Sequence, residues 1–175
     1  NATANDPVIS SAATANARVV RVFNGGNLTL EINSTLNLHP LNSNGISNYG
    51  TLTNDAGEIN IFRYNGNANI DGILNEGGTF INKLGGVINI GGVDRYGIYN
   101  TSTATFTNQF GGTINIGIAG GQIGSKGIQI DPSSPFFNFG TLNIVNTDSH
   151  GMNNEGNFSN SSSGVINIGT AGNPI

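Results

Sequence analysis

Residues 85–90 read Gly-Gly-Val-Ile-Asn-Ile, and residues 111–116 read Gly-Gly-Thr-Ile-Asn-Ile. The Ile-Asn-Ile triplet, with one Leu replacement, recurs in five segments: 58–61, 87–90, 113–116, 141–144 and 165–168. Their starts are 29, 26, 28 and 24 residues apart. A recurring period of roughly 20–50 residues is the mark of a stacked-repeat architecture, so the pattern predicts tandem repeats.

Two further landmarks divide each repeat. A Gly followed by an apolar residue recurs at positions 45, 72, 97, 127 and 151, and a Leu or Phe two residues before an Asn recurs at 52, 80, 106, 136 and 158. Each repeat therefore holds three short apolar segments that alternate with period two between Gly, Asn, Ser or Asp, which is typical of strands joined by tight turns. Because such a repeat is too small to bury its own apolar face, successive repeats must stack with equivalent strands paired in parallel.

The predicted fold is all-β: a parallel β-helix, or β-solenoid, with three short strands per coil and about six coils of ~26 residues over residues 20–175. The uneven coil lengths favour a right-handed helix over the regular left-handed triangular form. Residues 1–19 lack the repeat, and we expect an N-terminal arm or cap there.

Two rows of Asn are expected to form ladders inside the turns, where their side chains can donate and accept along the stack. The rows are Asn48, Asn75, Asn100 and Asn154, and Asn54, Asn82, Asn108, Asn138 and Asn160. The first ladder should break where Ile130 takes the place of Asn.

The composition narrows the function classes. Asn (30) and Gly (27) make up a third of the 175 residues, and both are poor helix formers. Only 9% of the residues are charged and the net charge is −4, so we expect no nucleic-acid partner. No apolar run approaches the ~18 residues that span a bilayer, so we expect no membrane insertion. The absence of Cys removes thiolate catalysis and disulfides. No motif indicates a cofactor or a metal, and none is assigned.

One outward Asn per coil is the first candidate site. Alternation in the third strand of each repeat places these amides in one line, which suits hydrogen bonds to a sugar, a second solenoid or a surface. A plain solvent-facing strand row is the alternative. The loop residues Arg63 and Tyr64 are expected beside the line. The line consists of Asn60, Asn89, Asn115, Asn143 and Asn167.

A weaker cluster is expected at the corner before each landmark Gly. Stacking would bring its members about 5 Å apart in neighbouring coils, close enough for acid–base chemistry. A solvated row of mixed charges explains the same residues and is favoured. No catalytic residue is assigned, because no pair of carboxylates recurs on adjacent coils as glycosidic cleavage needs. The cluster consists of Asp71, Asp94, Arg95, Lys126 and His150.

The motifs Gly-Gly-Val-Ile-Asn-Ile (85–90), Gly-Gly-Thr-Ile-Asn-Ile (111–116) and Thr-Phe-Thr-Asn (105–108) resemble repeats of bacterial surface β-helices. These include autotransporter passengers, filamentous-haemagglutinin-like adhesins and polymorphic outer membrane proteins. The resemblance covers residues 45–168, but Thr or Val replaces the Ala of the last family and the Phe-to-Asn gap is one residue shorter. It implies an extracellular or cell-surface, non-enzymatic, adhesive or structural role in a bacterium.

We therefore expect a structural or adhesive β-helix that assembles end to end into a filament or forms an adhesin stalk. After Ile168 only residues 169–175 remain, without a capping helix, so an open edge is expected that templates head-to-tail association with another copy. The alternative function is a carbohydrate-binding or polysaccharide-active β-helix. The expected partner is accordingly a second copy of the chain or a cell-surface glycan.

Overall fold

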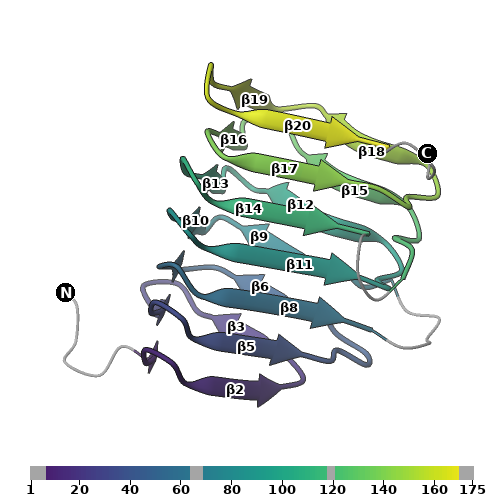
Figure 1. Ribbon diagram of the computed structural model, residues 1–175. Helices are drawn as coiled ribbons and strands as arrows, with labels where there is room; N and C mark the ends of the chain where they lie inside the picture. Colours follow the sequence, from purple (N-terminus) through teal and green to yellow (C-terminus); the bar gives the residue numbers. More distant parts are fainter. Residues whose placement is uncertain (1–6, 64–68, 118–120, 170–175) are drawn as a thin grey trace.

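The computed structural model describes residues 7–63, 69–117 and 121–169, and these residues form a β-solenoid with three faces (Figure 1). Sheet A contains β1 (Val8–Ile9), β4 (Asn27–Leu30), β7 (Thr51–Asn54), β10 (Thr79–Asn82), β13 (Thr105–Asn108), β16 (Pro135–Asn138) and β19 (Asn157–Asn160). Sheet B contains β2 (Thr14–Ala17), β5 (Thr35–Leu38), β8 (Glu58–Phe62), β11 (Val87–Gly91), β14 (Thr113–Ile116), β17 (Thr141–Ile144) and β20 (Val165–Ile168). Sheet C contains β3 (Val20–Val22), β6 (Ile46–Asn48), β9 (Ile73–Glu76), β12 (Tyr96–Thr101), β15 (Lys126–Ile130) and β18 (His150–Asn154).

The chain visits the sheets in the order C, A, B in every coil, and each strand pairs in parallel with its equivalent one coil away. This confirms the predicted all-β parallel solenoid with three strands per coil. In Figure 1 the strands of sheet B run from left to right in front and the chain returns behind them while climbing, which makes the coil right-handed. Within the described ranges no helix is long and apolar enough to cross a membrane.

The core consists of side-chain columns that run along the solenoid axis. In sheet A, the rings of Phe80 and Phe106 stack with centroids 4.6 Å apart, and those of Phe106 and Phe136 stack 4.7 Å apart. These spacings equal the rise between paired strands, about 4.8 Å, because in-register pairing places each side chain directly over its equivalent. The predicted columns are confirmed, and they end in Met152 and Phe158, which are only partly buried.

The landmark glycines face the core at a position that has no room for a side chain. A Cβ on Gly97 would lie 2.6 Å from the carbonyl oxygen of Gly127 and 2.6 Å from Cγ2 of Ile116. Gly72 makes the same close approach to Gly97 and to Ile90. Glycine recurs once per coil because sheet B packs against the backbone of sheet C at this point.

Both internal Asn ladders are present. Asn54 donates to Asn82 and Asn82 to Asn108, each across 2.8 Å, and the row continues to Asn138 and Asn160. In the other row, Asn48 donates to Asn75 and Asn75 to Asn100. That row stops at Ile130 as predicted, and the amide of Asn100 instead donates to two backbone carbonyls.

The N-terminal boundary differs from the expectation that residues 1–19 stand outside the repeat. Strands β1 and β2 pair with β4 and β5, so among the described residues the coiled part begins at Val8. The repeat was hidden because Ala15 and Ala17 occupy the positions that Leu36 and Leu38 hold in the next coil. These small side chains do not give the apolar pattern of a strand, and they leave an apolar hollow of about 470 Å³ at this end of the stack.

Candidate functional site

The outward Asn line on sheet B is a hydrogen-bonded ladder. The amide of Asn89 donates to Asn60 across 2.9 Å, that of Asn115 to Asn89 across 2.8 Å, and that of Asn143 to Asn115 across 2.8 Å. Asn167 extends it by a 2.7 Å bond to Asn143. All five predicted residues therefore lie in one row.

The ladder is longer than the sequence pattern suggested. Asn60 donates to Asn37, and Asn37 donates to Asn16, each across 3.0 Å. The signal for both was present in the order Thr-x-Asn-x of segments 14–17 and 35–38, but Ala or Leu replaces Ile there. The seven amides give sheet B one continuous polar stripe.

Each ladder amide keeps part of its hydrogen-bonding capacity. A primary amide has two N–H donors and two acceptor lone pairs, and the ladder uses one of each at the inner members. The four members from Asn60 to Asn143 are half-buried, whereas Asn167 is exposed. The inner members therefore each keep one acceptor lone pair. Asn60, Asn115 and Asn143 also keep one N–H donor, whereas the second N–H of Asn89 donates to Glu58 across 3.0 Å. The stripe offers these groups to a neutral polar partner at a fixed repeat.

Arg63 does not lie on this stripe as a free surface cation. The residue is buried, with 3% of its surface exposed, and its side chain donates to the carbonyl of Leu41 across 2.8 Å and forms an ion pair with Asp94. This pair ties the loop after β8 to the loop before β12. Tyr64, the other loop candidate, lies outside the described residues.

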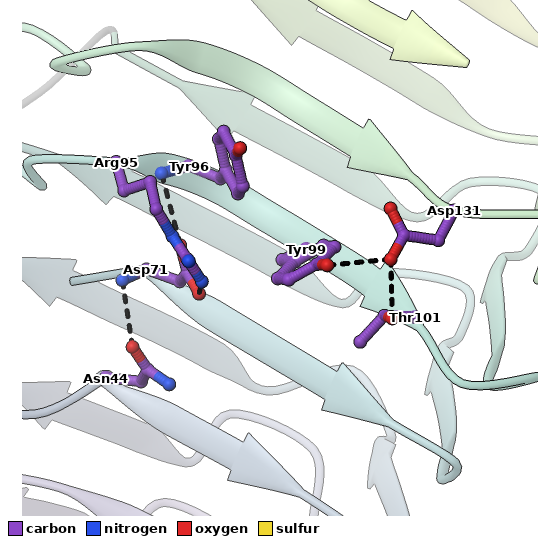
Figure 2. Close-up of polar contacts among 7 residues, drawn as sticks. All are labelled: Asn44, Asp71, Arg95, Tyr96, Tyr99, Thr101 and Asp131. Atoms are coloured by element: carbon purple, nitrogen blue, oxygen red, sulfur yellow. Dashed lines mark hydrogen bonds and ion pairs between the residues drawn. The ribbon is translucent and has the colours of Figure 1, made fainter. Parts of the chain in front are cut away.

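The corner cluster centres on a half-buried ion pair between Asp71 and Arg95 (Figure 2). Asp71 precedes β9 and is fully buried, and its two carboxylate oxygens accept from Nε and a terminal nitrogen of Arg95 at 2.8 and 2.5 Å. The backbone N–H of Tyr96 also donates to Asp71, and that of Asp71 donates to the side-chain oxygen of Asn44. Burial raises the pKa of Asp71 despite the hydrogen bonds and charge of Arg95, whereas the hydrogen bond that Arg95 donates to Asp71 raises the pKa of Arg95.

Two tyrosines cover this ion pair on the outer face of sheet C. The guanidinium carbon of Arg95 lies 4.8 Å from the ring centre of Tyr96 and 5.1 Å from that of Tyr99, in cation–π contact. The two rings meet edge to face at 5.3 Å. On the next strand, Nζ of Lys126 lies 5.5 Å from the Tyr96 ring. Arg95 and Lys126 thus share one aromatic partner.

A second carboxylate, Asp131, lies at the far end of the same face, as Figure 2 shows. The hydroxyls of Tyr99 and Thr101 each donate to it across 2.7 Å, and the amide of Gln129 donates across 3.1 Å. Burial acts to raise the pKa of Asp131, but these three hydrogen bonds and the charge of Lys126 outweigh it, so the pKa is lowered. Asp131 is thereby held as a carboxylate.

The predicted corner residues are therefore divided between several contacts. Asp71 and Arg95 pair with each other, whereas Asp94 pairs with Arg63. Lys126 and His150 follow in register on β15 and β18, and His150 is exposed beside Ser149.

Sequence reasoning did not single out Tyr99, Thr101 or Asp131 as site residues. The signal was the period-two alternation around the inward Asn100, which turns its two neighbours, Tyr99 and Thr101, outward.

The geometry of this face suits holding and stiffening more than proton transfer. Asp71, Asp94 and Asp131 each accept hydrogen bonds or an ion pair from the protein itself. Among the described residues, no group of three or more His, Asp or Glu side chains is arranged to hold a metal ion. The chain matches no protein-family model, no curated protein and no solved structure.

Proposed function

We propose that this chain is a non-enzymatic structural rod of the bacterial cell surface, used as an adhesin stalk or as a filament subunit that joins end to end. The observation that carries the proposal is the set of three Asn ladders, two inside and one outside, that join successive coils by side-chain hydrogen bonds. Buried, fully satisfied polar networks rigidify a fold. Such a ladder resists bending and shear between coils, which is what a stalk requires.

The pairing of the charged groups also favours a structural role. Arg63 and Asp94, and Arg95 and Asp71, join neighbouring loops of the corner instead of meeting across an open cleft. A catalytic acid needs access to its substrate, but Asp71 has no exposed surface. The extracellular setting follows the resemblance to bacterial surface repeats.

Negative-stain electron microscopy across a concentration series tests the proposal. Fibres of uniform width support the filament form, and isolated short rods support the stalk form. Irregular or collapsed particles contradict both. Turnover on a polysaccharide panel that is lost on replacing Asp94, Arg95 or Lys126 contradicts the non-enzymatic part.

A second candidate function is carbohydrate binding along the outer ladder. It is favoured by the acceptor lone pair that each inner ladder amide leaves unused on the outer face, and by the N–H donor that Asn115 and Asn143 leave unused. Replacement of Asn89 by Ala should weaken retention on immobilised polysaccharide if the ladder binds sugar. Unchanged retention would leave the ladder with its structural role alone.

A further inference from the structure

A hollow of about 460 Å³ lies outside the core, at the corner where sheet A turns into sheet B. This corner forms the left edge of the solenoid in Figure 1, between β13 and β14 and between β16 and β17. The volume falls within the range typical of small-ligand sites. The hollow is lined by Leu84, Thr107, Gln109, Phe110, Phe139 and Ser163.

The turns of this corner present large apolar side chains to solvent. Phe110 is 67% exposed, Leu84 is 65% exposed and Phe139 is 39% exposed. In the turn after β13, the N–H of Gly112 donates to the carbonyl of Gln109, which leaves Phe110 at the tip. Clustered exposed apolar groups with a polar rim mark interaction sites.

The fold itself does not require an aromatic residue at the tip. The turn between β19 and β20 has the same length and the same closing hydrogen bond, from Gly164 to Ser161, and it carries Ser162 at the position of Phe110. Burial of Phe110 is also not the reason, because two-thirds of its surface stays in water. The ring is therefore free to contact a ligand.

A shorter turn in the next coil supplies the second ring. Only residues 139–140 separate β16 from β17, whereas residues 109–112 separate β13 from β14. The N–H of Phe139 donates to the carbonyl of Asn108. In the coil below, the N–H of Gln109 donates to the carbonyl of Asn82 in the same way, so Phe139 lies one coil above Gln109. The two rings consequently come from different turn positions, and both line the hollow. The ring of Phe139 also lies 6.4 Å from that of Phe137.

The rest of the lining is polar and uncharged. Thr107 and Ser163 supply hydroxyls and Gln109 supplies an amide, and no lining side chain is ionisable. A charged ligand would find no counter-charge here, whereas a purely apolar one would displace water from Thr107 and Gln109 without replacing its hydrogen bonds. The hydroxyl of Ser163 already donates to the carbonyl of Phe139 across 3.1 Å and keeps a lone pair that can accept from a ligand. A pyranose ring has the matching chemistry, with C–H groups on its faces and hydroxyls around its edge.

We propose that this corner hollow binds a pyranose unit of a neutral glycan, with Phe110 and Phe139 as stacking surfaces and Gln109, Thr107 and Ser163 as hydrogen-bonding partners. The inference goes beyond the structural-rod proposal and does not rest on it. If electron microscopy shows no rods, the sugar-binding proposal is not affected. If the hollow binds no sugar, the structural-rod proposal is not affected.

Isothermal titration with neutral hexasaccharides tests the site. The probes are β-1,4-glucan, β-1,3-glucan, α-1,4-glucan and β-1,4-mannan hexamers, with hexagalacturonate as the acidic counterpart. We expect at least one neutral hexamer to bind, and Phe110→Ala to weaken that binding about tenfold, the effect of losing one aromatic stacking surface. Phe23→Ala is the matched control, because Phe23 is also 67% exposed but lies outside the hollow.

Four results would overturn the proposal. The first is that no neutral hexamer binds, and the second is that hexagalacturonate binds equally well. The third is that Phe110→Ala and Phe23→Ala lower the affinity for the neutral hexamer equally. The fourth is that Asn89→Ala lowers this affinity whereas Phe110→Ala does not. Sedimentation adds a fifth: a dimer that Phe110→Ala dissociates, in a protein that binds no hexamer, assigns the hollow to a second copy of the chain. Far-UV circular dichroism of each variant verifies that it is folded.

Discussion

The inner and outer Asn ladders share the same Asn–Asn bond, but the inner amides are buried and also donate to backbone carbonyls, so the inner ladder should contribute more to stability. Asn108 is fully buried, donates to Asn138, Gly112 and Thr141, and accepts from Asn82. Asn108→Ala leaves several of these groups without partners where water cannot replace them. At about 1–3 kcal/mol for each buried unsatisfied group, we expect a loss of about 3–5 kcal/mol in the free energy of unfolding.

Asn115, in the same coil, provides the matched comparison. It also donates to one Asn and accepts from another, each across 2.8 Å, but it is half-buried on the outer face. Water can satisfy the partners that Asn115→Ala releases, so we expect a loss of about 0.5–1 kcal/mol. Equilibrium urea unfolding followed by circular dichroism, with the slope against urea verified to be unchanged, measures both variants. Equal losses for Asn108→Ala and Asn115→Ala would refute the reasoning.

Three further predictions concern the core, the charges and the glycines. Phe106 stacks between two rings at 4.6 and 4.7 Å, so Phe106→Ala should cost about 3–5 kcal/mol in urea unfolding, and a loss below about 1 kcal/mol would contradict the stacked column. The lowered pKa of Asp131 means that its stabilisation is present above its unfolded pKa and lost as pH falls, so the stability gap between wild type and Asp131→Asn should narrow on acidification. The raised pKa of Asp71 predicts the opposite pH dependence, so any stability advantage of wild type over Asp71→Asn should shrink as pH rises. If the free energies of unfolding of Asp131→Asn and Asp71→Asn changed with pH in parallel, both assignments would be contradicted. Gly97→Ala should destabilise more than Gly25→Ala in thermal melting, because a Cβ at 97 meets a carbonyl at 2.6 Å whereas one at 25 meets nothing within 4 Å. Gly25→Ala carries only the backbone strain of its φ of +77°, about 1–2 kcal/mol, and the reverse order would contradict the close packing at the landmark glycines.

The fold was predictable because each coil repeats the environment of the last. Parallel in-register pairing places Phe106 over Phe80 and Asn108 over Asn82, so the period and the alternation together identify the inward positions. The same reasoning found the break at Ile130. It failed at residues 8–17, where Ala15 and Ala17 replace the larger apolar residues.

The sequence predicted where the charged residues of the corner lie, but not how they pair. Residue spacing placed Asp71, Asp94 and Arg95 near one another, but it did not reveal that Asp94 turns to Arg63. That pair joins two loops whose paths depend on corner insertions of unequal length. Such contacts are set by three-dimensional closeness rather than by a repeating position.

The sequence by itself determined the solenoid, its three sheets, its core columns and its Asn ladders, because these depend on local alternation repeated at a nearly constant period. Only the tertiary structure decided which partner each charged side chain takes and that Phe110 and Phe139 line one hollow. The physical reason is that the turns differ in length from coil to coil. A difference of two residues leaves the strands in register but moves the side chains between them to new neighbours.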